Sequence, residues 1–288
     1  MPGVSDAHAA IEAALREERE LVMSLGGYAL ELPGGVLVVN ERIPVPRFNF
    51  VQYVRLNRKR QSAFFERALD HYFQRALRPS IRAEQPVPDF LDATLRRLGF
   101  REASTSWSLL LRRRPSRPAP AESPFEVREA SVDELPLLAG FWMGDLEREE
   151  FLRALAVALA HPNPEERLVP GIALRDGRAA SAALLHAYRS CVGIHAVVTQ
   201  PSERGQGAAT ALVNGLARAP HLPEGADPVV MWSDSPRLDR RLSDLGFDVV
   251  ARYTVYELPA GAELALPASS PPAPPRWRPP RRRAEGQG

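Results

Sequence analysis

Apolar residues in the second half of the chain alternate between two patterns. Short runs rich in β-branched side chains are typical of strands, and stretches in which apolar residues recur at helical spacing are typical of helices. The order is strand, two helices, three strands, helix, strand, helix and strand, which predicts an α/β fold with a mixed sheet flanked by helices. The ranges are 125–129, 132–141, 147–160, 168–174, 179–188, 192–199, 210–219, 229–232, 237–245 and 249–258.

The first half carries a shortened version of this order. A helix is expected near residues 9–23, extended segments at 28–32, 36–40 and 49–54, and then a strongly amphipathic helix. Its aromatic stripe, which includes Phe64 and Phe65, is interpreted as core rather than as a ligand site.

The two halves end alike, which indicates an internal duplication. Residues 89–100 align with residues 236–247 without gaps at a constant offset of 147, and six of the twelve positions are identical. Each segment reaches Leu-Gly-Phe and is followed by a strand-like run. We therefore expect two similar domains in tandem.

Composition marks the boundaries of these domains. Residues 115–124 are rich in proline, serine and alanine, which predicts a linker between a domain at 1–114 and a domain at 125–258. Residues 259–288 lack apolar periodicity, and we expect them to be disordered. Five arginines against two glutamates give this tail a charge of +3, whereas the whole chain carries +2. Such a tail could touch nucleic acid or an acidic partner, but a solvated, functionally neutral extension is favoured.

The overall composition is that of a globular protein, with 44% hydrophobic and 25% charged residues. No run of eighteen apolar residues and no signal peptide is present, so we expect a cytoplasmic location without membrane contact. Cys191 is the only cysteine, which excludes an intrachain disulfide and a cysteine-rich metal site. We interpret it as a small buried strand residue, and we expect no metal.

A glycine-containing loop between the strand at 192–199 and the next helix is the main candidate for chemistry. Its sequence follows the pattern Arg-x-x-Gly-x-Ala, which is neither the P-loop nor the dinucleotide fingerprint. Backbone N–H groups at a helix start are unpaired and favour negative charge, so the loop predicts a phosphate site. Its residues are Arg204, Gly205, Gln206, Gly207, Ala208 and Ala209.

Two neighbouring features strengthen this interpretation. Pro201 ends the strand before the loop, and Leu245-Gly246-Phe247 separates the last helix from the last strand. With these, residues 125–258 resemble the GCN5-related N-acetyltransferase (GNAT) superfamily. The resemblance implies that acetyl-CoA binds where the strand before the loop splays from its neighbour. The loop amides would then hold its pyrophosphate, and Val197, Val198 and Thr199 its pantetheine arm, Val197 and Thr199 through backbone hydrogen bonds.

The reaction implied is direct attack of an amine on the acyl thioester. An aliphatic amine has a pKa of about 10 and must first lose a proton. His195, on the strand that lines the family's active site, is the candidate general base, and a histidine satisfied within the core is the competing interpretation. His186, Glu147 and Glu149 are weaker alternatives.

The chain departs from the family where a proton donor is expected. The positions at which the family often has asparagine and tyrosine hold Ser235 and Leu242, and leucine cannot protonate the leaving thiolate. Tyr253, Tyr256 or Ser235 could serve instead, or the thiolate could leave without an acid.

The first half has no glycine at the position of the loop, where residues 57–62 read Asn-Arg-Lys-Arg-Gln-Ser. We therefore expect this half not to bind acyl-CoA. Completing the fold, covering an acceptor pocket or forming a homodimer remain its alternative roles. The function expected for the chain is an acyl-CoA-dependent N-acyltransferase acting on a small amine or a protein amine. The alternative is a non-catalytic acyl-CoA-binding or scaffold protein.

Overall fold

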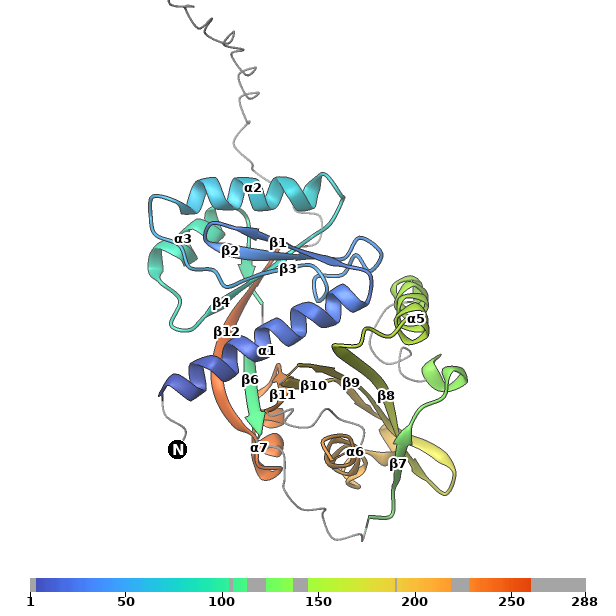
Figure 1. Ribbon diagram of the computed structural model, residues 1–288. Coiled ribbons are helices and arrows are strands. Elements are labelled where there is room, and N and C mark those ends of the chain that lie inside the picture. Colours follow the sequence, from blue (N-terminus) through green and yellow to red (C-terminus); the bar gives the residue numbers. More distant parts are fainter. Residues whose placement is uncertain are drawn as a thin grey trace, which may run out of the picture.

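The computed structural model describes most of the chain (Figure 1). Most of the predicted linker, all but the first residue of the tail, and much of the helix expected at 132–141 lie outside the described residues. The described ranges are 4–103, 106–112, 123–136, 145–189, 191–218 and 228–259.

The first half forms three helices and six strands. The long helix α1 confirms the helix expected at 9–23, while a short strand β4, which the apolar pattern had not indicated, precedes the helix α3. The bounds are α1 Val4–Ser24, β1 Tyr28–Leu32, β2 Gly35–Val39, β3 Phe50–Gln52, α2 Gln61–Phe73, β4 Ser80–Glu84, α3 Asp89–Arg97, β5 Arg101–Glu102 and β6 Trp107–Arg112.

The second half follows the predicted order closely. Its strands and helices are β7 Glu126–Glu129, α5 Asp145–Ala160, β8 Glu166–Arg175, β9 Arg178–Tyr188, β10 Cys191–Thr199, α6 Ala208–Leu216, β11 Val229–Ser233, α7 Pro236–Asp244 and β12 Asp248–Glu257. Short 3-10 turns, η1 Val132–Glu134 and η2 Pro201–Glu203, precede α5 and α6.

All strands join one twelve-stranded sheet, in which the two halves exchange their last strands. The order is β1-β2-β3-β4-β12-β6-β11-β10-β9-β8-β7, with β5 beside β12. Strand β6 of the first half thus lies between β11 and β12, and β12 of the second half lies between β4 and β6 (Figure 1). The predicted linker separates the two halves in sequence, but their strands belong to one continuous sheet.

Helices cover both faces of this sheet. Helices α2, α3, α6 and α7 pack on one face, where β2 contributes Leu37 and β12 contributes Tyr256. Helices α1 and α5 pack on the other, which we call the α1 face. In Figure 1, α1 lies across β12 and β6, close to the middle of the sheet. None of the described helices is long and apolar enough to cross a membrane.

The duplication is visible in the positions of the helices. Helices α3 and α7 begin and end at the offset of 147 that the sequence alignment gave. Both are followed by a glycine at positive φ, Gly99 at 89° and Gly246 at 82°. The residues that precede α2 and α6, Arg60 and Gly207, have the same offset. The duplication therefore extends to the loop that carries the candidate chemistry.

Candidate active site

Strands β10 and β11 separate part of the way along their length. Their parallel pairing comprises only Val192 with Val229 and Gly193 with Val230, although β10 continues to Thr199. A bulge interrupts the pairing of β10 with β9 between His195 and Val198. Ala196, within that bulge, has a φ of 54°. The edge of β10 beyond Gly193 is therefore open on the side of β11.

The glycine loop lies at the end of this open edge. Gly205 and Gly207 have φ values of 81° and 93°, and neither has a heavy atom within 4 Å of the position that a Cβ would take. The N–H groups of Gly205, Gly207, Ala208 and Ala209 donate to no acceptor within the described part of the chain. Unpaired donors at the start of α6 fit the negative charge of a pyrophosphate.

Side chains of the loop fix it to neighbouring strands. Arg204 Nε donates to the carbonyl oxygen of Thr199 at 3.3 Å, and Gln206 Nε2 donates to that of Ser202 at 3.0 Å. Arg175 of β8 donates to Gln206 Oε1 and, at 3.0 Å, to Glu203. The side chains thus hold the loop, while the amides of Gly205, Gly207, Ala208 and Ala209 remain unpaired.

The end of β10 is held from the opposite edge, by β9. The hydroxyl of Ser181 donates to the carbonyl oxygen of Val198 at 2.5 Å and lies 3.2 Å from Thr199 Oγ1. Val197, in the bulge, packs against the core beneath α6. All three residues expected beside the pantetheine therefore lie at the open end of β10.

His195 lies on the α1 face and contacts a carboxylate from the first half of the chain. Its Nε2 is 2.8 Å from Oε1 of Glu17 in α1. His186 of β9 places Nδ1 at 2.8 Å from the same oxygen. Glu17 and His186 are fully buried, and His195 is 8% exposed. The structure thus joins the candidate base to His186 through a glutamate that the sequence analysis did not single out.

Gly193 makes room for this arrangement. A Cβ on Gly193 would lie 2.2 Å from His195 Nε2 and 2.3 Å from Glu17 Oε1. No side chain larger than hydrogen fits there without displacing the pair. The glycine is therefore part of the site, because alternate residues of a strand share one face.

Burial and charge together determine the protonation of this cluster. Burial alone would raise the pKa of Glu17, but the charges and hydrogen bonds of His195 and His186 lower it to about 2. Burial alone would lower the pKa of His186, but the carboxylates of Glu166 and Glu17 raise it to about 9. Glu17 is therefore ionised and His186 protonated at neutral pH.

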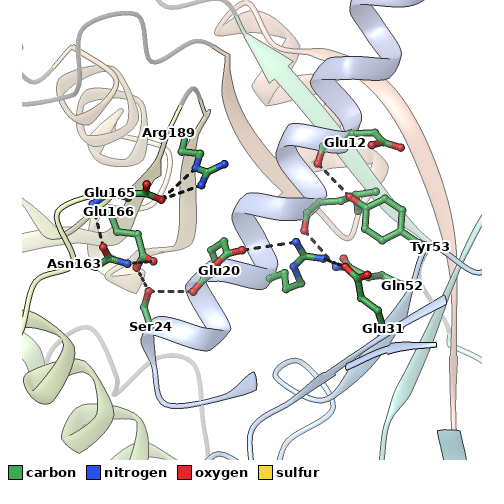
Figure 2. A network of polar contacts seen from close by, with 12 residues as sticks. Glu12, Glu20, Ser24, Glu31, Gln52, Tyr53, Asn163, Glu165, Glu166 and Arg189 are labelled. Carbon is green, nitrogen blue, oxygen red and sulfur yellow. Dashed lines mark hydrogen bonds and ion pairs between the residues drawn. The ribbon is translucent and has the colours of Figure 1, made fainter. Parts of the chain in front are cut away.

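Glu166 connects this cluster to the surface. Its Oε2 lies 3.7 Å from His186 Nε2 and contacts the hydroxyl of Ser24, and its Oε1 accepts from Asn163 at 2.8 Å. Figure 2 shows the contacts of Glu166 with Ser24 and Asn163 at the end of α1, beside the exposed pair of Arg189 and Glu165. No group of three His, Cys, Asp or Glu side chains in the described ranges could hold a metal ion.

The candidate acids occupy different surroundings. Ser235 caps α7, and its Oγ accepts from the N–H of Leu238 at 3.2 Å. Tyr253 is buried on the α1 face beside Trp232, and its hydroxyl has no described partner. Burial raises the pKa of Tyr253 above its ordinary value, so the phenol stays protonated. Tyr256 lies on the opposite face and donates to Asp92 at 2.8 Å.

Three residues remain from the sequence analysis: Leu242 and the weaker base candidates Glu149 and Glu147. Leu242 is buried in the core beneath α6 and α7, so no proton donor stands at this position. Glu149 is exposed on α5 and pairs with Arg153. The side chain of Glu147 lies outside the described residues.

The corresponding loop of the first half differs in its backbone and its side chains. Asn57 Oδ1 accepts from the N–H groups of Lys59 and Arg60, both at 3.1 Å. Arg60, which precedes α2, has a φ of −101°, unlike Gly207. The amide of Arg60, the counterpart of the open amide of Gly207, is therefore satisfied locally.

Open amides at a helix start beside two separating strands are features by which an α/β protein can bind an anion. Residues 129–236 match the model of one protein family, the Acetyltransferase (GNAT) family. No curated protein matches the chain in sequence.

Solved structures share the fold at low sequence identity. A functionally unknown conserved protein from Staphylococcus epidermidis has a TM-score of 0.64 and 10% identity, over 81% of this chain and 95% of that one. A GCN5-related N-acetyltransferase from Kribbella flavida has a TM-score of 0.60 and 16% identity, over 85% and 95%. A tandem GNAT protein from the clavulanic acid biosynthesis pathway has a TM-score of 0.54 and 13% identity, over 80% and 79%. The fold is thus that of two GNAT-like domains in tandem.

Proposed function

We propose that this protein transfers an acetyl group from acetyl-CoA to an amine. The observation that carries the proposal is the set of open amides of Gly205, Gly207, Ala208 and Ala209, placed at the end of an unpaired strand edge in a domain that matches the GNAT family. The pyrophosphate of acetyl-CoA would bind these amides, and its pantetheine would follow Val197, Val198 and Thr199. The first half, whose corresponding loop has no glycine and holds Arg60 in place of Gly207, would bind none.

His195 would act as the general base. Its Nε2 faces Glu17, which leaves Nδ1 to accept a proton from the ammonium form of the acceptor. The neutral amine then attacks the thioester carbonyl carbon, and the carbon–sulfur bond breaks as the amide forms. As the amide forms, its nitrogen loses the second proton and the sulfur gains one from an acid, which the proton from the nitrogen then restores. The products are the acetylated amine and CoA thiol.

Tyr253 is the proposed proton donor to the sulfur. It shares the α1 face with His195, and its hydroxyl is protonated and has no described partner. Ser235 is the second choice, because its oxygen already accepts a hydrogen bond as the cap of α7.

A non-catalytic acyl-CoA-binding or scaffold protein is the alternative function. The buried Leu242, at the position where the family often has tyrosine, favours it. The two functions share the binding site and differ in turnover, so they can be separated by experiment.

Calorimetry with acetyl-CoA tests the binding site. We expect one acetyl-CoA per chain. An absence of binding at millimolar ligand would contradict both functions.

Release of CoA thiol in the presence of amines then tests catalysis. A panel of small amines, amino acids and peptides identifies the acceptor, and binding without release across the panel would favour the scaffold.

Replacing His195 tests the base. A general base contributes about 10²- to 10⁴-fold to the rate, so His195→Ala should lower kcat by this factor with little change in the KM for acetyl-CoA. Added imidazole should restore part of the loss. His161→Ala, at an exposed position beyond α5, is the matched control. A kcat within a few-fold of wild type across pH would exclude His195 as the base.

A further inference from the structure

We propose that Glu17 of the first half is the positioning residue of the active site in the second half, and that it orients His195 for proton transfer. This inference rests on the proposed function, because it assigns a role in the same reaction. It gives the first half, whose corresponding loop contains no glycine, a direct part in the chemistry.

Helix α1 is fixed on both sides of Glu17. Next to it, Glu18 binds the buried Arg82 of β4 at 2.6 Å. One turn before, the carbonyl oxygen of Glu12 accepts from the hydroxyl of Tyr53 at 3.2 Å. At the end of the helix, Ser24 contacts Glu166 of β8 (Figure 2). These contacts tie α1 to strands of both halves, so the position of the Glu17 carboxylate is defined by the whole sheet.

The carboxylate determines which nitrogen of His195 carries the proton. An ionised carboxylate can only accept, so the nitrogen that faces it at 2.8 Å must be Nε2–H. The neutral ring then keeps its lone pair on Nδ1, which has no hydrogen bond to a described residue. A carboxylate that fixes the tautomer and angle of a catalytic imidazole is a recurrent device in proton transfer.

His186 holds the carboxylate in place. Its Nδ1–H donates to the oxygen that His195 also contacts, and its Nε2 faces Glu166 at 3.7 Å. Glu17 from α1 and Glu166 from β8 are the charged groups recorded around the two histidines in the described part of the chain. With His186 protonated, one carboxylate bridges two imidazoles, and the buried negative charge is balanced.

Gly193 provides independent support. A strand position inside a sheet gains nothing from glycine, which weakens strands. Here its missing side chain is the space in which Glu17 Oε1 and His195 Nε2 meet. The absence of a side chain at position 193 therefore makes the contact between Glu17 and His195 possible.

Two substitutions at Glu17 distinguish the effect of its charge from the effect of its hydrogen-bond acceptor. Glu17→Gln keeps an oxygen that can accept from both rings, whereas Glu17→Met removes the acceptor at similar size. If Glu17 orients His195, kcat should fall by about tenfold in Glu17→Gln and by about 10²-fold in Glu17→Met, with the KM for acetyl-CoA unchanged. Glu12→Gln, which removes the same charge from the same helix away from the histidines, should retain wild-type kcat. Equal kcat in wild type and Glu17→Met would overturn the proposal.

The tautomer of His195 provides a readout that needs no turnover. Nitrogen-15 NMR of the wild-type protein should show the neutral His195 ring protonated at Nε2. A ring protonated at Nδ1 would overturn the proposal, whether or not any variant folds. Gly193→Ala should lose the preference for Nε2–H and match the kcat of Glu17→Met.

The two proposals fail in distinguishable ways. A wild-type protein that does not bind acetyl-CoA contradicts the proposed function, while the tautomer still reports on the contact. A wild-type protein that binds and turns over acetyl-CoA, with unchanged kcat in Glu17→Met, contradicts the role of Glu17 alone.

Discussion

Gly207 combines a φ of 93° with empty space in front of the amides that begin α6. A β-branched side chain is strained at this φ and would occupy the space that a pyrophosphate needs. We therefore expect Gly207→Val to weaken acetyl-CoA binding by about 10²-fold or more, since it removes charge-assisted hydrogen bonds. Calorimetry gives the dissociation constant.

Arg60→Val is the matched control for this change. Arg60 is the counterpart of Gly207 in the first half, at the offset of 147 and before α2. Its φ of −101° accepts valine without strain, so binding should remain at the wild-type level. Equal losses in both variants would show that the loop of the second half is not the site.

The cluster around Glu17 should make stability depend on pH. The pKa of His186 rises from 6.5 to about 9 on folding, so its stabilisation is complete below pH 6.5 and is lost as pH rises through 9. The pKa of Glu17 falls from 4.5 to about 2, so its stabilisation is complete above pH 4.5 and is lost as pH falls through 2. Both contributions are complete between pH 4.5 and 6.5.

Urea unfolding across pH measures this dependence. The free energy of unfolding should decline between pH 6.5 and 9, and His186→Gln should remove most of that decline. A flat profile in this interval for the wild type would mean that His186 is not protonated in the folded protein.

At the scale of elements, each exchanged strand is tied to the last helix of the half it enters. Ser108 of β6 donates to Asp239 of α7 at 2.9 Å, and Tyr256 of β12 donates to Asp92 of α3 at 2.8 Å. The two aspartates are counterparts in the duplication. Ser108→Ala should cost about 1–2 kcal/mol, because the buried Asp239 loses this donor and keeps Arg252 at 3.2 Å. Tyr256→Phe should cost about 1 kcal/mol, because Asp92 is partly exposed and keeps Arg96.

Tyr188→Phe serves as the control for these two variants. Tyr188 ends β9 and its hydroxyl makes no recorded hydrogen bond to the described residues, so its removal should change stability by less than about 0.5 kcal/mol. Urea unfolding again gives the free energies. Losses no larger in Ser108→Ala and Tyr256→Phe than in Tyr188→Phe would mean that these contacts do not hold the strands.

The apolar pattern predicted most elements, because their buried faces are continuous in sequence. It did not indicate β4, because Arg82 and Glu84 interrupt the apolar pattern of this short strand. The charge of Arg82 is tolerated there because Glu18 pairs with it and Phe50 and Trp107 flank its guanidinium. Nor could the pattern assign neighbours to β6 and β12, because burial alone does not say which strand edge covers a segment.

The same limit applies to the candidate site. The loop and His195 could be identified from the sequence because glycines between a strand and a helix, and a histidine within a strand, are local signals. Glu17 is one of several glutamates on α1, and nothing in the helix itself distinguishes it from Glu12 and Glu20, which are partly exposed. Its burial depends on two histidines that lie about 170 residues further along the chain. Only the folded arrangement brings them together.

At the scale of the molecule, neither half is complete alone. The second half without β6 has a gap between β11 and β12, and without α1 it has no carboxylate beside His195. The first half without β12 has an open edge on β4. An open, apolar strand edge favours association, so we expect the structure to be stable only when both halves fold together. The duplication is then expected to form one folding unit rather than two independent domains.

Cleavage between the halves tests this unity. With a protease site inserted in the predicted linker at 115–124, the cut protein should stay associated and unfold in a single calorimetric transition, because β6 and β12 each pair with strands of the other half. The two fragments expressed separately should be insoluble or unfolded, and expressed together they should purify as a complex. If the second half alone folds, binds acetyl-CoA and turns it over at the wild-type rate, then neither the strand exchange nor Glu17 is required, and the first half has a role outside the reaction.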